Sequence, residues 1–423
     1  MPHHVDIHIY THGMKSSYRR TALEKSPSCA RVVPVKETHS AIKNIGGRQN
    51  KTNHQRSQLI NKTWDLVQKV IVPNLKFKMH HNTRYSYNDF FRLLTYAGIN
   101  NGCAEGSANN RNFYSEKDCP NGDTLLYHLK KFSTSELLES YETITDQIIS
   151  MAKNRGLLNR PVDCAIDYTD ELYYGDRNDP MVVGTKPQKG TSKAYRFATL
   201  TIIEKDCRLT IRALRVDENS SKHEIVADLV KYAQERIEIG VLCIDRGFYS
   251  VDVFTTLNNL GVKYLIPAVQ NPKNIREMRG LYPPQILPIT IKSQNSCNKS
   301  VTTNLVMILD VEKEKRGFVT NMDLDRMHTR RLSKVYSKRW GIETSYRVKK
   351  DFRPKTTSKN YVIRLFYFLF SVCLYNLWEL VNVILALVDR IDPKTPFIAA
   401  KLFGTILFRV FELNGMDPPP DFN

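Results

Sequence analysis

The sequence predicts an α/β protein in which a helical N-terminal region precedes a mixed β-sheet. Residues 59–158 follow the 3.6-residue apolar period of helices, whereas after Pro161 short apolar runs of strand length alternate with amphipathic helices. The chain has 423 residues, of which 41% are hydrophobic. That length suggests two or three domains, and that composition is typical of globular proteins that bury a large core.

Positive charge is concentrated in two segments. The chain has a net charge of +19, from 62 Lys and Arg against 43 Asp and Glu. Residues 1–56 hold ten of these cations against three acids, and residues 326–360 hold twelve against two. Such a chain is expected to bind a polyanion, either nucleic acid or an anionic membrane. Residues 1–56 show no periodicity, so we expect a basic, disordered arm or a translated stretch upstream of the true start.

The helical region is expected to contain short helices joined by polar turns. A helix over residues 85–99 is followed by an Asn- and Gly-rich stretch that we expect to be a loop. Asp123 is the expected N-cap of the next helix, and Ser133 with Glu136 forms a capping box for the one after it. Beside a basic arm, this pattern fits a helix-turn-helix-like DNA-binding region, with a plain helical bundle as the alternative.

Beyond Pro161 the expected order of elements is β-β-β-α-β-α-β. The first strand, "VDCAIDY", reaches Asp167, and the fourth, "IGVLCIDRGF", reaches Asp245. The first three strands are close enough for a meander, whereas the last two need helical crossovers. Because sites in open α/β sheets form where strands terminate, both aspartates are candidate site residues, although a strand-end Asp can also simply form a turn.

The stretch "VYSKRWGIETSYRVKKDF" (335–352) predicts one helix with an unusual face. Its residues Tyr336, Arg339, Glu343 and Lys350 lie at offsets 0, 3, 7 and 14 and so share one narrow stripe. A solvated face with ion pairs is one interpretation. However, Glu343 and the two strand-end aspartates would together place three carboxylates near a polyanion-binding surface, which is typical of a divalent-metal site. Carboxylate oxygens are ligands that Mg²⁺ prefers, and two such ions can promote phosphodiester displacement.

The run Leu365 to Val388 is the most apolar part of the chain. Its uncharged portion, Leu365 to Trp378, is 14 residues long before Glu379 interrupts it. Because a helix needs about 20 apolar residues to span a bilayer, we expect a buried helix and no membrane partner. The eight cysteines form no CxxC pair, and we expect reduced thiols in the cytoplasm.

The chain resembles the DDE transposases of prokaryotic insertion sequences, in the large group with the signature Y-x2-R-x3-E-x6-K. Tyr336, Arg339, Glu343 and Lys350 match all four positions and all three spacings. The segments "AIDYTDELYYG" and "LCIDRGFYS" resemble the first two motifs of the family, and "FVTNM" resembles the strand that leads to the third. The likeness spans roughly residues 160–390.

The resemblance implies an RNase H-like mixed sheet with a small β-rich insertion, since only 98 residues separate Asp245 from Glu343. It also implies that Asp167, Asp245 and Glu343 are the catalytic residues and bind two Mg²⁺ ions, for which Mn²⁺ substitutes. Asp170 and Glu171 lie close by, which leaves open which acid binds metal. The position directly after "CAI" favours Asp167.

The resemblance further implies that Tyr336, Arg339 and Lys350 bind phosphates of the transposon end. Two neighbouring residues are additional DNA-binding candidates with alternatives of their own. Trp340 either stacks on a terminal or flipped base or packs in the core. Arg246 either contacts a phosphate or pairs with a nearby acid.

The expected organisation follows these assignments. It comprises a basic arm (1–56), a helical DNA-binding region (57–158), the first part of the catalytic core (159–270), the β-rich insertion (271–320), the last core helices (321–390), and a C-terminal helix and tail (391–423). The expected activity is metal-dependent cleavage at transposon ends and strand transfer of the 3′-OH into target DNA. We expect a cytoplasmic, nucleoid-associated enzyme that acts on double-stranded DNA as a homodimer in the synaptic complex. A metal-dependent DNA nuclease and a catalytically inactive DNA-binding derivative are the alternatives.

Overall fold

The structure is a computed structural model that describes residues 62–80, 82–114, 118–269, 283–293, 299–309, 314–389, 396 and 398–413. The chain divides into two units, Met1–Gln55 and Arg56–Asn423. All described residues belong to the second unit. The expected basic arm lies outside them, and the domain boundaries remain predictions.

The N-terminal region of this unit is helical, as expected from its periodicity. A π-helical turn, η2 (Val67–Ile71), precedes α2 (Tyr87–Ile99), α3 (Ala104–Tyr114), α4 (Gly122–Leu129) and α5 (Thr134–Lys153). The capping box of Ser133 and Glu136 at α5 is confirmed. The cap of α4 was expected at Asp123, but it is Asn121, whose side chain accepts a hydrogen bond from the amide of Thr124.

The stretch after α2 was expected to be a loop, and it forms the helix α3 instead. Its sequence has little helical periodicity, but Ala104 and Ala108 are buried where α3 packs against α2 and α4. The carboxylate of Glu105 also accepts a hydrogen bond of 2.8 Å from the amide of Gly122 at the start of α4. Tertiary packing therefore overrides weak local propensity here.

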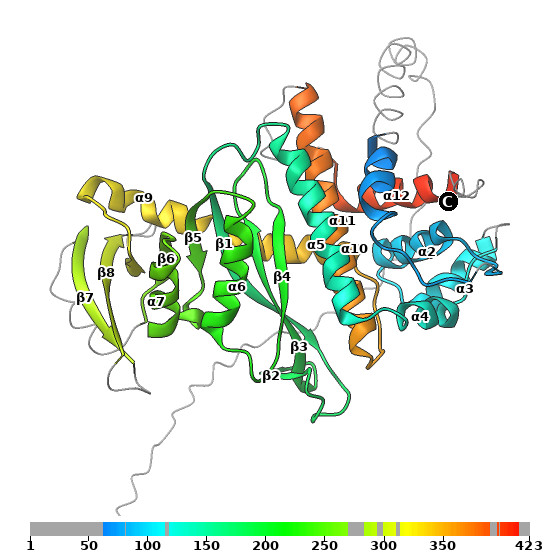
Figure 1. The fold of residues 1–423 in the computed structure, drawn as a ribbon, viewed down its shortest axis with the longest axis horizontal. Helices are drawn as coiled ribbons and strands as arrows, with labels where there is room; N and C mark the ends of the chain where they lie inside the picture. Colours follow the sequence, from blue (N-terminus) through cyan, green and yellow to red (C-terminus); the bar gives the residue numbers. More distant parts are fainter. Residues whose placement is uncertain are drawn as a thin grey trace, which may run out of the picture. The chain divides into compact units, whose positions relative to one another are not determined.

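A nine-stranded mixed sheet forms the centre of the unit (Figure 1). Its strands are β1 (Val162–Leu172), β2 (Val183–Gln188), β3 (Thr191–Ile202), β4 (Thr210–Val216), β5 (Ile239–Ile244), β6 (Tyr264–Pro267), β7 (Gln285–Lys292), β8 (Ser300–Leu309) and β9 (Lys315–Thr320). The order is β2-β3-β1-β5-β6-β9-β8-β7, and β4 pairs with β3. Strands β1, β3 and β4 are antiparallel, whereas β1, β5 and β6 are parallel. Helix α6 (Lys222–Gln234) connects β4 to β5, and α7 (Val251–Asn259) connects β5 to β6. The expected RNase H-like mixed sheet is confirmed, with β2 as an additional strand.

The strand-rich segment between β6 and α9 extends this same sheet. Strand β9 pairs antiparallel with β6, and β8 and β7 follow outward. Figure 1 accordingly shows β7 and β8 at the opposite end of the unit from α2, α3 and α4.

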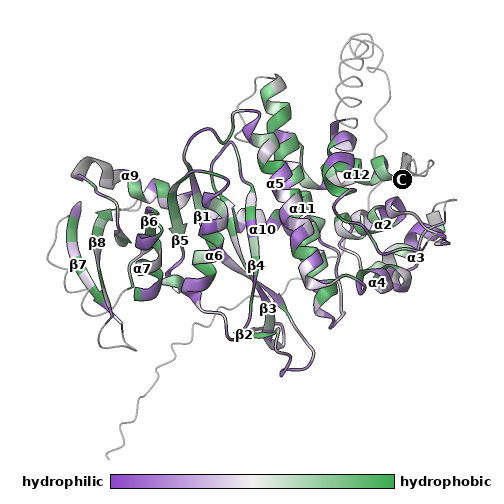
Figure 2. Cartoon of the chain, viewed as in Figure 1, coloured by the Kyte–Doolittle hydropathy of each residue, from purple (hydrophilic) through white to green (hydrophobic). Residues whose placement is uncertain are grey.

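Side chains alternate between two apolar layers along the central strands. Ile244 and Ile266 belong to the larger core cluster, which includes residues of α6 and α7. Their neighbours Cys243 and Leu265 belong to a second cluster with Leu332 and Ile342 from the C-terminal helices. Figure 2 shows hydrophobic residues along β5 and β8 and hydrophilic residues in the loops at the strand ends. The sheet is therefore covered on both faces, as its parallel strands require.

The segment 335–352 was expected to be one helix, but it is split between α9 (Arg326–Ser337) and α10 (Trp340–Phe352). The break is a tight turn in which the amides of Arg339 and Gly341 bond to carbonyls three residues earlier, at 2.9 and 2.8 Å. Lys338 in this turn is held at the sheet, because its ammonium contacts Asp163 at 2.6 Å and Glu204 at 3.0 Å.

Helix α11 (Tyr361–Asp389) is the expected buried helix, and α12 (Ala400–Leu413) follows it. Among the described residues, one helical stretch, Tyr361–Leu387, is long and apolar enough to cross a membrane, and 89% of its most apolar window is buried. The buried Asn376 explains how α11 docks on the sheet. Its amide group bonds both the N–H and the carbonyl of Thr210 at 2.8 Å, at the beginning of β4.

Candidate active site

The register of the sheet brings Asp167 and Asp245 next to each other. Strands β1 and β5 are parallel, and their last paired residues are Ile166 and Ile244. Each aspartate directly follows one of these residues, so the two lie at the same level on strands about 4.8 Å apart. Asp167 was expected where its strand ends, but β1 continues to Leu172 because this segment still pairs with β3.

Both aspartates point to the face of the sheet that α9 and α10 cover. Cys243 belongs to the layer under these helices, and Asp245 is two residues further along the same backbone direction. Ala165 and Asp167 are related in the same way. Helix α10 is fixed at this point, because the hydroxyl of Tyr346 donates a hydrogen bond of 3.0 Å to the carbonyl of Asp167 and lies 2.7 Å from the hydroxyl of Thr199.

One guanidinium group connects Glu343 to the sheet. Arg339 contacts the Glu343 carboxylate at 2.8 Å and the Asp167 carboxylate at 3.5 Å. Asp245 also acts electrostatically on Arg339 and Asp167. Arg339 therefore bridges Asp167 and Glu343, and Asp245 lies at the level of Asp167 on the neighbouring strand, although the three acids are far apart in the chain.

Burial dominates the electrostatics of Asp167. Desolvation, together with the smaller effects of the Asp245 and Glu343 charges, raises the pKa of this carboxyl to about 6. The amide of Tyr168, which donates a hydrogen bond of 2.8 Å, and the charge of Arg339 oppose this rise. A buried carboxylate with a raised pKa gains stability from any additional cation that reaches it.

The acids fit a divalent cation by chemistry, but Arg339 occupies the space between two of them. Within the part of the chain that the structure describes, no group of three or more His, Cys, Asp or Glu residues is close enough to hold a metal ion. The donors are hard carboxylate oxygens, which suit Mg²⁺ or Mn²⁺. Arg339 supplies the neutralising positive charge, so cation binding requires its guanidinium to withdraw from Asp167 and Glu343.

Two aromatic rings enclose Arg339, and their exposure differs. The guanidinium carbon lies 5.6 Å from the ring centre of Tyr336 and 5.7 Å from that of Trp340. Arg339 is only 8% exposed, which differs from the expected phosphate contact, whereas Trp340 is 61% exposed and does not lie in the core. The large exposed indole stands one turn before Glu343 on α10.

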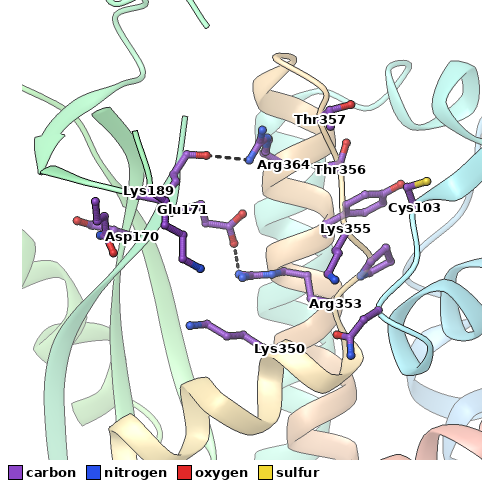
Figure 3. Close-up of a pocket in the computed structure, with 15 residues that line it drawn as sticks. Cys103, Asp170, Glu171, Lys189, Lys350, Arg353, Lys355, Thr356, Thr357 and Arg364 are labelled. Carbon is purple, nitrogen blue, oxygen red and sulfur yellow. Dashed lines mark hydrogen bonds and ion pairs between the residues drawn. The ribbon is translucent and has the colours of Figure 1, made fainter. Parts of the chain in front are cut away.

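Cavities lie on two sides of the acids. One, of about 520 Å³, is lined by Asp245, Arg246 and Tyr336 together with residues of β6 and β9. The other, of about 790 Å³, is lined by Lys350 and residues of β1 (Figure 3). Tyr336, Arg339 and Lys350 therefore do not share one stripe. The first and last face different cavities, and Arg339 lies among the acids.

The two alternative acids on β1 already have cationic partners. Asp170 accepts two hydrogen bonds from Arg196, at 2.6 and 2.7 Å, and another of 2.6 Å from Thr185. Glu171 pairs with Arg353. Strand alternation also places Asp170 on the opposite face from Asp167. This geometry favours Asp167 among the three acids.

Sequence reasoning missed Tyr346 and Lys338, which both position the helices that carry the site. The 3.6-residue period places Tyr346 one turn after Glu343, on the side of α10 that meets the sheet. That spacing was the available signal for Tyr346. Lys338 lies in a run of cations, and nothing local distinguishes it from its neighbours.

Comparison with known proteins agrees with this architecture. Residues 180–377 match a family model described as transposase DDE domain. Asp245 and Glu343 fall within the match, and Asp167 precedes it. Comparison with curated protein sequences gave no match.

Among solved structures, a piggyBac transposase synaptic complex with hairpin DNA has a TM-score of 0.52. It shares 10% sequence identity over 81% of this chain and 77% of that chain. A pre-cleavage Mos1 transpososome covers 45% of this chain and 62% of its own at 11% identity, with a TM-score of 0.16 that carries no structural argument. The chain therefore resembles a transposase DDE domain over residues 180–377 and shares its fold with the piggyBac transposase structure.

Proposed function

We propose that this protein cuts DNA at the ends of its own element and joins the freed 3′-OH to target DNA. One observation carries the proposal. Arg339 bridges the carboxylates of Asp167 and Glu343, and Asp245 follows the neighbouring strand at the same level as Asp167, in a chain whose residues 180–377 match a transposase DDE domain. Such a site must bind phosphodiesters, orient an attacking oxygen and tolerate the negative charge of the reaction.

Asp167, Asp245 and Glu343 would hold two Mg²⁺ ions, or Mn²⁺ in their place. When bound, these ions would supply Lewis-acid stabilisation of both the attacking and the leaving oxygen. The protein's own side chains would position and desolvate these acids. Tyr346 orients Asp167 through its backbone carbonyl. Burial of Asp167 makes binding of a cation favourable, because the cation restores the charged carboxylate.

The substrate strand would be held on either side of the acids. Trp340 is exposed and able to stack on an unpaired base. Arg246 and Tyr336 line the smaller cavity beside Asp245, and Lys350 lines the larger one. Water would be the first nucleophile, and the freed 3′-OH the second. No covalent bond between protein and DNA is needed.

Two alternatives use the same surface. A metal-dependent nuclease would hydrolyse DNA without joining it, and an inactive derivative would only bind it. Incubation of a pre-cut end with target DNA distinguishes the nuclease from a transposase, because only a transposase produces a joined product. The closeness of Asp245 and Glu343 to Asp167, whose pKa is raised, favours a catalytically active site over the inactive DNA-binding derivative.

Replacement of Asp245 by Ala tests the proposal. With a duplex that carries the end of the element, we expect Mg²⁺-dependent cleavage to fall by about 10³-fold or more while duplex binding persists. Asp167→Ala and Glu343→Ala should behave alike. Asp228→Ala removes an exposed acid outside the site and should leave cleavage unchanged. Full strand transfer by any one of the three variants would refute the assignment.

The assembly and the cellular site belong to the same proposal. Joining two ends in one synaptic complex calls for a homodimer, which sedimentation with and without end duplex tests. The net charge of +19 supports association with the nucleoid in the cytoplasm. The piggyBac complex contains hairpin DNA. A denaturing gel of the cleaved products would show whether this protein forms hairpin ends.

A further inference from the structure

The 790 Å³ cavity beyond Lys350 is strongly cationic, and no assigned role accounts for most of its cations. Five cations line it against two acids: Lys189, Lys350, Arg353, Lys355 and Arg364 against Asp170 and Glu171. Both acids already have cationic partners, Asp170 in Arg196 and Glu171 in Arg353. Among the described residues, the ammonium groups of Lys189, Lys350 and Lys355 form no ion pair. We call this cavity the basic groove.

A buried cation in the wall indicates that the basic groove is built for an anion. Arg364 is only 8% exposed, yet the described part of the chain provides no carboxylate for it. Its guanidinium donates to the carbonyls of Ser358 at 2.8 Å and Leu172 at 3.3 Å instead. Carbonyl oxygens orient this group without cancelling its charge. A buried, uncompensated charge is costly, and an anionic ligand would offset that cost.

The tip of the β2–β3 hairpin places Lys189 in the groove at a conformational cost. Gln188 pairs with Thr191, so Lys189 and Gly190 form a two-residue turn with positive φ angles of 48° and 84°. This is the hairpin geometry that Asn-Gly adopts most readily. A lysine there is strained relative to Asn, and such strain recurs at functional positions. In Figure 3, Lys189 and Lys350 enter the same space from opposite walls.

The third wall is fixed to the N-terminal helical region. The segment between α10 and α11 bonds to the connection between α2 and α3, with the Lys355 amide 2.9 Å from the carbonyl of Gly102, and Lys355 forms a β-bridge with Cys103. Gly98 packs directly on the backbone of Phe352, where no side chain fits. The groove therefore joins the sheet, α10 and the helical region in a preformed arrangement.

The groove lies a short distance from the acids. Lys350 is seven residues after Glu343, which is about 10 Å along α10. Asp170 is three residues after Asp167, also about 10 Å along β1. Since consecutive phosphates of a DNA strand advance about 3.4 Å along the duplex axis, this corresponds to roughly two or three nucleotides.

We propose that the basic groove binds the sugar-phosphate backbone of the element's end, two or three nucleotides from the bond that is cut. Lys189, Lys355 and Arg364 contact the phosphates together with Lys350, and the hydroxyls of Thr356 and Thr357 line the same wall. The groove carries the strand from the acids toward the helical region. This inference rests on the proposed function in that DNA is the substrate, but it concerns binding and not chemistry.

Cys103 provides a direct probe, because it lines the groove and is exposed, whereas the other described cysteines are buried. Full-length protein would be mixed, without divalent metal, with end duplexes that carry a thiol tether on one backbone phosphate at a time. Disulfide formation should peak two or three nucleotides from the cleavage position and disappear with Cys103→Ser. Equal crosslinking along the duplex, or a peak only on a separate target duplex, would overturn the assignment.

Charge removal gives a second readout that does not depend on catalysis. The double variant Lys189→Asn, Lys355→Ala should bind the end duplex about fivefold to tenfold more weakly per lost contact, with a salt slope smaller by roughly two. Asn suits the positive φ at position 189, so folding should not suffer. Lys186→Ala, an exposed strand cation outside the groove, is the matched control. Equal losses in the control and the double variant would contradict the proposal. Normal binding by Asp245→Ala, with cleavage lost, keeps the two proposals separate.

Discussion

At the scale of single residues, Asp167 shows how the fold prepares its site. The carboxyl is held near other acids in a partly buried position, and its pKa rises from 3.8 to about 6. The folded protein therefore binds more protons than the unfolded chain between these values. Its free energy of unfolding should fall as the pH rises from about 4 to about 6.

Asp167→Asn tests this linkage, because Asn cannot titrate. We expect the variant to lose about 2 kcal/mol of the pH dependence of the unfolding free energy across that window. Urea unfolding in metal-free buffer at several pH values between 4 and 7 measures it. A variant with the same slope as the wild type would show that Asp167 is not desolvated. Asp228→Asn, at an exposed position, should keep the wild-type slope.

Trp340 is the second residue-scale case, since a 61% exposed indole beside the acids has little to contribute to folding. Trp340→Ala should change the free energy of unfolding by less than about 0.5 kcal/mol. It should weaken end binding by about tenfold to a hundredfold if the indole stacks on one base. Trp340→Phe should retain part of that affinity. Fluorescence anisotropy with a labelled end duplex would measure the losses, and unchanged affinity in Trp340→Ala would exclude stacking.

At the scale of elements, the contact between α10 and β1 decides where Glu343 lies. The Tyr346 hydroxyl, buried between the two, bonds to the carbonyl of Asp167 and to Thr199. Ile342 packs under the same helix in the second apolar cluster. The helix is therefore fixed on both sides of Glu343, which lies between these residues.

Tyr346→Phe removes the hydroxyl and keeps the ring. We expect a loss of about 1–2 kcal/mol in the free energy of unfolding. Cleavage should slow more than end binding weakens, because the acids lose their alignment while the basic groove remains. Tyr127→Phe is the control, because Tyr127 is exposed and far from Tyr346 in the sequence. Parallel losses of binding and cleavage would indicate general destabilisation instead.

At the scale of the whole molecule, much of the arrangement could be predicted from sequence. The compact apolar runs that lead to Asp167 and Asp245 predicted two buried strands with both acids near a sheet edge, and the pairing of Ile166 with Ile244 places the two acids at the same level. The apolar run ending near Val388 was also correctly expected to be a buried helix. These features depend on local patterns, and local patterns can be recognised in one sequence.

Other features depend on contacts between distant segments, so the sequence could not reveal them. The break between α9 and α10 follows from Lys338 bonding to Asp163 and Glu204, 134 or more positions away. Helix α3 forms where packing overrides a polar sequence. Arg339 was expected to bind phosphate from its place in the signature, but its position between two carboxylates appears only once the fold is assembled.

We propose that Asp167, Asp245 and Glu343 form one cation site, which Arg339 occupies until metal and DNA arrive. Crystals of the full chain with an uncut end duplex and Mn²⁺ would test it through the anomalous scattering of manganese. We predict anomalous density within about 2.0–2.6 Å of carboxylate oxygens from all three acids, with the Arg339 guanidinium withdrawn from Asp167. Manganese bound elsewhere, with Arg339 still joining Asp167 and Glu343 beside the bound DNA, would contradict the account.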